Sequence, residues 1–179
     1  FSGSKGEENT SYSFAMDSTG KKTTKSVYSY ASGKTAATAS DIYALRKVET
    51  WKMEGAIGSE AAIYIKSDTA YLGDKTEENI DSVTTYKVPV TAGEIAAKKG
   101  AVKDVTTYWY EGLIATPTTY QDAAAAKDIY ALIKTVTVKD SVTRGETYFS
   151  GSKGEENTSY SFAMDSTGKK TSKSVYTYA

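Results

Sequence analysis

Residues Phe1–Ala31 read FSGSKGEENTSYSFAMDSTGKKTTKSVYSYA, and this stretch returns almost unchanged at Phe149–Ala179. The two copies differ at two positions, both of which exchange Thr and Ser. Their offset is 148 residues, which predicts one period of a tandem array followed by the start of the next period. Arrays of this kind commonly provide length, spacing or multivalency, so the repeat argues against a single catalytic site.

The repeated stretch itself predicts a β-hairpin. Ser11–Met16 and Thr23–Tyr30 are rich in strand-forming residues, and Asp17–Gly20 between them has the Asx and Gly chemistry of a chain reversal. The second copy predicts the same hairpin at Ser159–Tyr178. Whether each hairpin packs within the chain or against another chain is left open by the sequence.

Three short motifs also recur inside the period, in the same order each time. They are K-x-E-E-N at Lys5–Asn9, Lys75–Asn79 and Lys153–Asn157, Y-x-Y at Tyr28/Tyr30, Tyr108/Tyr110 and Tyr176/Tyr178, and D-I-Y-A-L at Asp41–Leu45 and Asp128–Leu132. The shared order predicts an ancestral module of about 74 residues that was duplicated before the longer period was copied. Chance matches in a sequence of low diversity are the alternative.

The remaining pattern favours a mainly β fold. Tyr is abundant at 15 copies, and Tyr and Thr favour strands. Further strands are expected at Asp41–Met53, Ala61–Ser67, Ser82–Val90, Val102–Tyr110 and Asp128–Asp140. Short helices are expected at Ala92–Lys99, closed by Gly100, and at Gln121–Lys127.

These elements predict two small, related β-rich subdomains in each 148-residue repeat, of sandwich-like or grasp-like architecture. The first half-repeat spans residues 1–71 and the second spans 72–148, while 149–179 begin the next repeat as a hairpin copy of 1–31. A module of this size buries little surface alone, so we expect it to be stabilised by neighbouring repeats.

Composition excludes several functional classes. Lys plus Arg and Asp plus Glu are each 22, so a net charge of zero gives no electrostatic reason to expect a nucleic-acid partner. Cys and His are absent, which excludes thiol and imidazole catalysis and ordinary zinc or haem ligation. No apolar run is long enough for a membrane span. We therefore predict a chain that is not an enzyme, with no catalytic residues, cofactor or metal.

Two motifs invite specific chemistry. The K-x-E-E-N motifs hold all three Asn residues beside Lys and Glu, the set needed for an intramolecular Lys–Asn isopeptide bond. Their adjacent glycines and high charge favour a solvated turn instead. The acidic stretch from Asp68 to Asp81 offers oxygen ligands for Ca²⁺, but it has no EF-hand spacing and so favours a solvated loop.

The aromatic run Tyr108-Trp109-Tyr110 is the remaining candidate site, as a platform that faces a glycan or another ligand. Strand alternation places Tyr108 and Tyr110 on one face and Trp109 on the other. One of these faces is therefore expected to belong to the core, and plain sheet packing is the alternative to ligand binding.

With these repeats and this composition, the chain resembles the tandem-repeat regions of Gram-positive bacterial cell-surface proteins. The resemblance implies a secreted protein at the cell surface or cell wall, acting as a stalk or spacer or in cell–cell aggregation and adhesion. Its partners would be neighbouring repeats and other copies of itself. The alternatives are a self-assembling subunit of a surface layer, sheath or filament, and a multivalent glycan- or protein-binding module.

Overall fold

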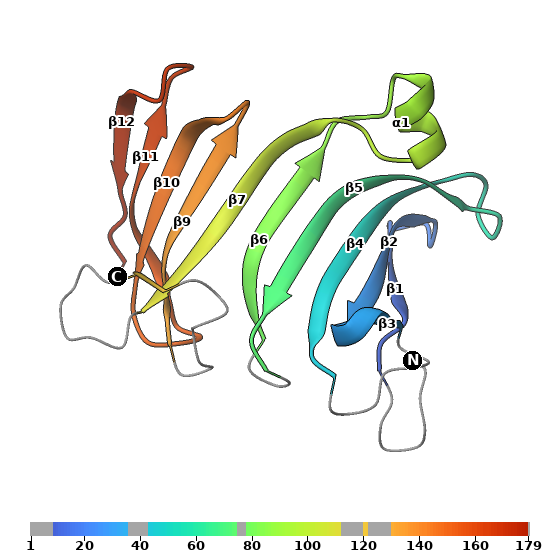
Figure 1. Ribbon diagram of the computed structural model, residues 1–179, viewed down its shortest axis with the longest axis horizontal. Helices are drawn as coiled ribbons and strands as arrows, with labels where there is room; N and C mark the ends of the chain where they lie inside the picture. The colour runs from blue at the N-terminus through green and yellow to red at the C-terminus, as the bar shows by residue number, and fades with distance from the viewer. Residues whose placement is uncertain (1–8, 36–42, 75–77, 112–119, 122–129, 179) are drawn as a thin grey trace. The chain divides into compact units, whose positions relative to one another are not determined.

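The computed structural model describes residues 9–35, 43–74, 78–111, 120–121 and 130–178. The chain is mainly β, which confirms the predicted class (Figure 1). The strands are β1 (Tyr12–Met16), β2 (Lys22–Tyr30), β3 (Lys34–Thr35), β4 (Leu45–Glu54), β5 (Ala61–Leu72), β6 (Asn79–Tyr86), β7 (Val102–Glu111), β8 (Tyr120–Gln121), β9 (Leu132–Lys139), β10 (Val142–Ser150), β11 (Asn157–Met164) and β12 (Lys170–Val175). A 3-10 turn (Ala31–Gly33) and helix α1 (Ala92–Ala97) complete the described elements.

The chain forms two compact units, and neither is continuous in sequence. The first contains Phe1–Ala70 and Thr84–Lys103, and the second contains Tyr71–Val83 and Asp104–Ala179. The hydrogen-bonded order is β1-β2-β4-β5 in the first unit, with β3 on β2, and β7-β9-β10-β11-β12 in the second, with β8 on β7. Strands β5, β6 and β7 contribute residues to both units. The described strands do not show the sandwich-like or grasp-like packing expected from sequence.

Both copies of the repeated stretch fold into the predicted hairpin. Strands β1 and β2 are antiparallel, as are β11 and β12, and each pair has a register shift just before its Met. In the first turn the Asp17 carboxylate accepts from Thr19 N–H at 2.9 Å, and in the second Asp165 accepts from Thr167 N–H at 2.8 Å. Both hairpins pair within the chain, because β2 also pairs with β4 and β11 also pairs with β10.

Strand β10 was not predicted from the sequence, and the turn before it explains why. Strands β9 and β10 are joined at Asp140-Ser141, whose φ angles of 50° and 64° both lie in the left-handed region. A two-residue hairpin turn of this kind is usually signalled by Asn-Gly or Asp-Gly. Asp-Ser is not such a signal, so the turn could not be recognised from the sequence. The helix expected at Gln121–Lys127 lies outside the described residues, except for Gln121, which belongs to β8.

Helix α1 confirms the helix expected at Ala92–Lys99 and begins with a reciprocal cap. The Thr91 side chain accepts from Glu94 N–H at 3.2 Å, while the Glu94 carboxylate accepts from Thr91 N–H at 2.9 Å. The same carboxylate accepts from Ala101 N–H at 2.9 Å, beyond the end of the helix. The residue that ends the helix is Lys98, with a left-handed φ of 53°, and not the expected Gly100.

The lowered pKa of the Glu94 carboxyl predicts that the stability of the fold decreases in acid. Hydrogen bonds from the backbone of Thr91 and Val90 lower its pKa from 4.5 to about 2. A lowered pKa stabilises the folded chain above the ordinary value, and this stabilisation disappears as pH falls from 4.5 toward about 2. We expect Glu94→Gln to reduce the difference in thermal midpoint between about pH 6 and about pH 3. An unchanged pH dependence in the variant would contradict this role.

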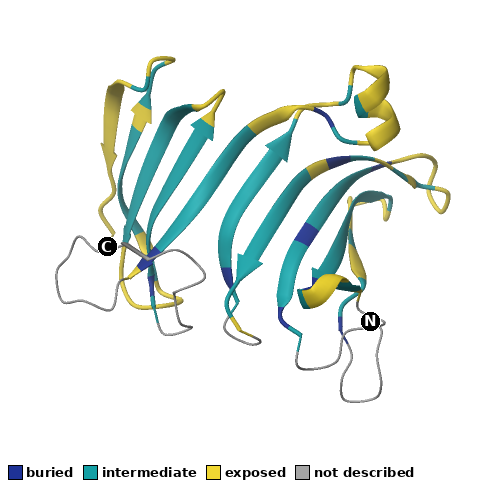
Figure 2. Cartoon of the chain, viewed as in Figure 1, coloured by how far each residue is buried: buried dark blue, intermediate teal, exposed yellow. Residues whose placement is uncertain are grey.

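Burial does not alternate along most strands, and few of the residues that the structure describes are buried. In β9 and β10 nearly every residue is half-buried, whichever face it occupies (Figure 2). Long side chains cover the strand surface, as where Lys170 Nζ lies 3.8 Å from the centre of the Phe162 ring and Lys173 Nζ lies 4.8 Å from that of Tyr160. The buried cores are small clusters centred on Tyr30 and Tyr110.

Candidate functional site

The recurring motifs meet at one place in each unit. In the first unit Tyr30 of the Y-x-Y pair is 8% exposed and packs against Tyr43 of D-I-Y-A-L. In the second unit Tyr110 is 6% exposed and packs against Tyr130 of the second D-I-Y-A-L. We call each of these assemblies a motif cluster. Motifs that are far apart in sequence are therefore in contact.

The Tyr hydroxyl joins the third motif to each cluster. The second Tyr of every pair donates to the backbone carbonyl of the residue that directly follows the motif Asn. These hydrogen bonds run from Tyr30 to Thr10 (2.9 Å), from Tyr110 to Ile80 (2.8 Å) and from Tyr178 to Thr158 (2.9 Å). Burial raises the pKa of Tyr110 to about 12, so this phenol stays protonated as a donor. Its role here is structural.

A backbone hydrogen bond completes each cluster. Ala31 N–H donates to Ala44 O at 2.8 Å, and Glu111 N–H donates to Ala131 O at 3.0 Å. The two acceptors occupy the Ala position of D-I-Y-A-L and are almost fully buried, at 4% and 1% exposed. The shared motif order is therefore matched by a shared set of contacts.

The Asn residues of the motifs differ in their surroundings. Asn9 and Asn79 are buried, at 5% and 4% exposed, whereas Asn157 is exposed. Within the second unit, Lys153 Nζ donates to Asn79 Oδ1 at 3.0 Å, although the two residues are 74 positions apart. Lys153 belongs to the K-x-E-E-N motif that follows the motif of Asn79. The Lys that would correspond for Asn9, Lys75, lies outside the described residues.

We predict that Lys153 and Asn79 form only a hydrogen bond and do not react to give an isopeptide bond. An isopeptide bond forms from a Lys amine inside an apolar core, whereas Lys153 is exposed. We expect the intact mass of the purified chain to equal the sequence mass. A deficit of one ammonia that disappears in Lys153→Met would instead demonstrate an isopeptide bond. The same measurement on Lys75→Met covers the motif whose Lys is not described.

Each unit also contains a turn that was not predicted from the sequence and that is hydrogen-bonded to another strand. Gly55–Glu60 and Gly151–Glu156 share the pattern G-x-x-G-x-E, and this repeated string was the available signal. In the first turn Glu60 accepts from Gly58 N–H and from Lys22 N–H, both at 3.1 Å. The backbone hydrogen bond from Lys22, the largest influence, lowers the pKa of Glu60. The carboxylate thereby fastens the β4–β5 turn to the start of β2.

The second turn has the same construction. Glu156 accepts from Gly154 N–H at 2.8 Å and from Leu132 N–H at 3.1 Å, which fastens the β10–β11 turn to the start of β9. Burial raises the pKa of Glu156, but hydrogen bonds from the backbone outweigh it, so the pKa lies below its ordinary value. Both Glu side chains are therefore charged acceptors near neutral pH.

The Lys that follows D-I-Y-A-L lies in an ion-pair network in each unit. In the first unit Lys47 Nζ is 3.5 Å from Asp68, and Asp68 also accepts from Lys99 Nζ and Tyr86 Oη, each at 2.8 Å. Burial raises the pKa of Asp68, but the hydrogen bonds from Lys99 and Tyr86 outweigh it and the pKa is lowered. The carboxylate charge is thus balanced by lysines, which disfavours Ca²⁺ at Asp68.

The second unit has a matching network. Lys134 Nζ is 2.8 Å from Glu146 Oε1, and Lys170 Nζ is 3.1 Å from Glu146 Oε2. Burial raises the pKa of Glu146, but hydrogen bonds from the two lysines outweigh it, and the pKa is lowered. Both networks join side chains from different strands, so they contribute to the fold.

The three aromatic candidates are buried to different extents. Tyr110 is buried in the second motif cluster, and Tyr108 packs against it. Trp109 lies between them on the same strand, β7, and is half-buried. Nothing in this geometry identifies a ligand, so the interpretation of Trp109, Tyr108 and Tyr110 as ligand-facing aromatics stays a prediction.

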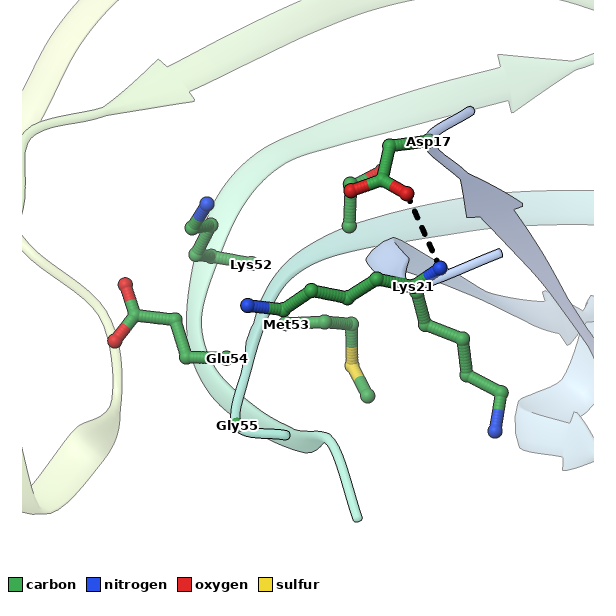
Figure 3. A pocket seen from close by; sticks show the side chains of 8 residues that line it. Asp17, Lys21, Lys52, Met53, Glu54 and Gly55 are labelled. Carbon is green, nitrogen blue, oxygen red and sulfur yellow. Dashed lines mark hydrogen bonds between the residues drawn. The ribbon is translucent and has the colours of Figure 1, made fainter. Parts of the chain in front are cut away.

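A pocket of about 450 Å³ lies in the first unit, where the β1–β2 turn meets the end of β4 (Figure 3). Its lining residues are Asp17, Lys21, Lys22, Thr23, Lys52, Met53, Glu54 and Gly55. Lys21 N–H donates to the Asp17 carboxylate at 3.1 Å. Since ammonium and carboxylate groups are mixed in this lining, the pocket has no strong preference for ions of either sign.

No family model, curated protein or solved structure matches this chain. Among the residues that the structure describes, no helix is long and apolar enough to span a membrane. Inferences about function therefore depend on the geometry above.

Proposed function

We propose that this chain is a non-catalytic structural module of a tandem array, which acts as a stalk or spacer in an extracellular bacterial surface protein. Each 148-residue repeat would contain two related β-rich subdomains, each organised around one motif cluster. The observation that carries the proposal is the motif cluster itself, because the same side chains and the same backbone bonds build it in both units.

The contact between successive motifs supports an array. Lys153 of one motif reaches the buried Asn79 of the preceding motif, so here the start of one repeat supplies a side chain to the half-repeat before it. Nearest-neighbour contacts of this kind stabilise repeat proteins in proportion to the number of repeats. The hydroxyls of Tyr30 and Tyr110 and the carboxylates of Glu60 and Glu156 are used in structural hydrogen bonds, which supports a mechanical rather than a chemical role.

The spacer role is tested by adding periods to the chain. Residues 1–148 would be placed once or twice before residues 1–179, and each protein measured by small-angle X-ray scattering and sedimentation. We expect the maximum dimension to increase by a constant amount per added period, with an unchanged cross-sectional radius. A maximum dimension that hardly changes would contradict a spacer, because the periods would then be collapsing onto one another.

A further inference from the structure

The connection between β6 and β7 is longer than its counterpart in the first half-repeat. The Tyr30 hydroxyl bonds to a carbonyl 20 residues earlier in the chain, whereas the equivalent bond of Tyr110 reaches a carbonyl 30 residues earlier. The difference lies between the strands, because residues 17–21 join β1 to β2 whereas residues 87–101, which include α1, join β6 to β7. We call residues 87–103, which are this connection and the first two residues of β7, the α1 excursion. A short turn closes the related hairpin, so closing the hairpin does not require the excursion.

Hydrogen bonds fix the backbone of the α1 excursion. At its base Lys87 N–H donates to Ala101 O, and Ile65 N–H of β5 donates to Lys98 O, both at 2.8 Å. At its centre the Glu94 carboxylate, which caps α1, also accepts from Ala101 N–H at 2.9 Å. The exposed side chains of the excursion therefore extend from a defined backbone.

Four aliphatic side chains of the α1 excursion are at least half exposed. They are Val90 (78%), Ile95 (59%), Val88 (58%) and Val102 (50%). The Glu94 carboxylate brings them together, because it accepts from the N–H groups of Val90 and Ala101, and each of the four residues lies within two positions of Val90, Glu94 or Ala101. The excursion thus gathers aliphatic surface that no described residue buries.

Two of these side chains form a pair at the start of α1. Thr91 is the N-cap of the helix, so Val90 precedes the cap and Ile95 is the fourth helical residue. Apolar residues at these two positions commonly pack against each other as a hydrophobic staple. The usual staple fixes the entry of the chain into a helix, but here both members remain largely exposed. Figure 2 shows α1 as mostly exposed.

The α1 excursion is also basic, although the net charge of the whole chain is zero. It contains four lysines and one acid, Glu94, whose carboxylate is occupied by backbone donors. Lys99 pairs with Asp68 at 2.8 Å. The other three lysines are exposed, and they are Lys87, Lys98 and Lys103. Positive charge therefore accompanies the aliphatic surface.

This combination restricts the chemistry of a partner. A glycan or a polyphosphate would pair with the lysines but leave the aliphatic side chains in water, and an apolar protein surface would leave the lysines unpaired. An anionic bilayer satisfies both, because its headgroups attract lysine and its acyl boundary accepts aliphatic side chains. We propose that the α1 excursion binds the surface of an anionic lipid membrane. This inference goes beyond the spacer role and does not depend on it.

In the bound state, Val90 and Ile95 insert at the acyl boundary while the exposed lysines lie among the headgroups. The excursion lies in the interface and does not cross the bilayer. A single excursion makes a small contact, so its binding is weak and reversible. In the proposed array the excursion returns once in each period, and several excursions bound to one membrane would increase the overall affinity.

The test is co-sedimentation of the chain with lipid vesicles. One set of vesicles contains phosphatidylcholine with phosphatidylglycerol, and the other contains phosphatidylcholine alone. We expect the chain to sediment with the anionic vesicles only, and the bound fraction to decrease as salt is added, because salt screens the attraction between lysines and headgroups.

Exposed residues of the same unit provide matched controls for the aliphatic pair. We expect Val90→Ser with Ile95→Gln to lower the partition coefficient at least about tenfold. Ile57 is 63% exposed in the β4–β5 turn, outside the excursion, and Ile57→Gln should leave the partition coefficient unchanged. Circular dichroism of each variant checks that the β fold is retained.

The lysines are tested in the same way. We expect Lys98→Gln to lower the partition coefficient for anionic vesicles about fivefold. Lys66 of β5 is also an exposed lysine of this unit, and Lys66→Gln removes the same charge away from the excursion, so it should have less than about a twofold effect.

A fluorescent label reports insertion directly, since the chain has no cysteine of its own. Ile95→Cys and Ile57→Cys chains are each labelled with a nitrobenzoxadiazole dye, whose emission shifts to the blue in an apolar environment. We expect anionic vesicles to shift the emission of the label at position 95 and not that of the label at position 57.

Several outcomes would overturn the membrane site. They are no sedimentation with anionic vesicles, equal sedimentation with phosphatidylcholine alone, equal effects of the excursion variants and their controls, and the same emission shift at both labels. A concentration-dependent dimer that Ile95→Gln abolishes, without vesicle binding, would assign the aliphatic surface to a second copy of the chain instead.

Discussion

Gly151→Ala is expected to lower the free energy of unfolding by about 3 kcal/mol. Gly151 has a φ of 120°, which side-chain-bearing residues rarely adopt, and an added Cβ would lie 2.6 Å from the carbonyl oxygen of Glu155. The backbone of the β10–β11 turn would have to move to relieve this overlap. The turn also places the Glu156 carboxylate, so its hydrogen bond to Leu132 would be strained as well. Urea unfolding followed by Tyr fluorescence measures the loss.

The same turn contains the control. Gly154 has a φ of 82°, but an added Cβ would meet no atom within 4 Å, so Gly154→Ala should cost only about 1 kcal/mol. Gly55 repeats the environment of Gly151 in the first unit, with a φ of 133° and Ser59 O 2.8 Å from the added Cβ, and Gly55→Ala should cost nearly as much. Equal losses at Gly151 and Gly154 would show that overlap with the backbone does not decide the effect.

Tyr110→Ala is expected to lower the free energy of unfolding by about 3 kcal/mol, because it empties the centre of the second motif cluster. Tyr110→Phe keeps the ring and removes only the hydroxyl that donates to Ile80 O, so the expected loss is about 1 to 2 kcal/mol. Thermal and urea unfolding of the two variants separate ring packing from the hydrogen bond.

Tyr178 provides the exposed counterpart of Tyr110. Its hydroxyl makes the equivalent hydrogen bond to Thr158 O at 2.9 Å, but the residue is 58% exposed. Water replaces the lost donor there, so Tyr178→Phe should change stability by less than about 0.5 kcal/mol. Equal losses of stability in Tyr110→Phe and Tyr178→Phe would show that burial does not increase the contribution of the Tyr110 hydroxyl to stability.

The hairpins could be predicted from the sequence because their information is local. Asp17 and Gly20 set the turn, and the Tyr- and Thr-rich flanks set the strands. The division at residues 71/72 and 148/149 remains a prediction. The compact units are discontinuous in sequence, and Thr84–Lys103 belongs to the same unit as Phe1–Ala70. Strand β10 was missed because Asp140-Ser141 adopts left-handed geometry without a glycine.

The contacts between motifs could not be predicted, for a physical reason. Motif order indicates that segments are related, but it does not give the strand register that brings Tyr110 to Ile80 O or Lys153 to Asn79. Face alternation did place Tyr108 and Tyr110 together. It did not describe most strands, since nearly every residue of strands such as β9 and β10 is half-buried, whichever face it occupies.

The equivalence of the two hairpins has a consequence for how a gene of this kind changes length. Recombination between the DNA segments that encode Phe1–Ala31 and Phe149–Ala179 would insert or delete a whole period. The joined protein would still have a hairpin that pairs with a β10-like strand before it and a β4-like strand after it. In the proposed array, such an exchange would therefore change the number of periods without requiring new packing contacts, and the near-identity of the copies would itself promote it.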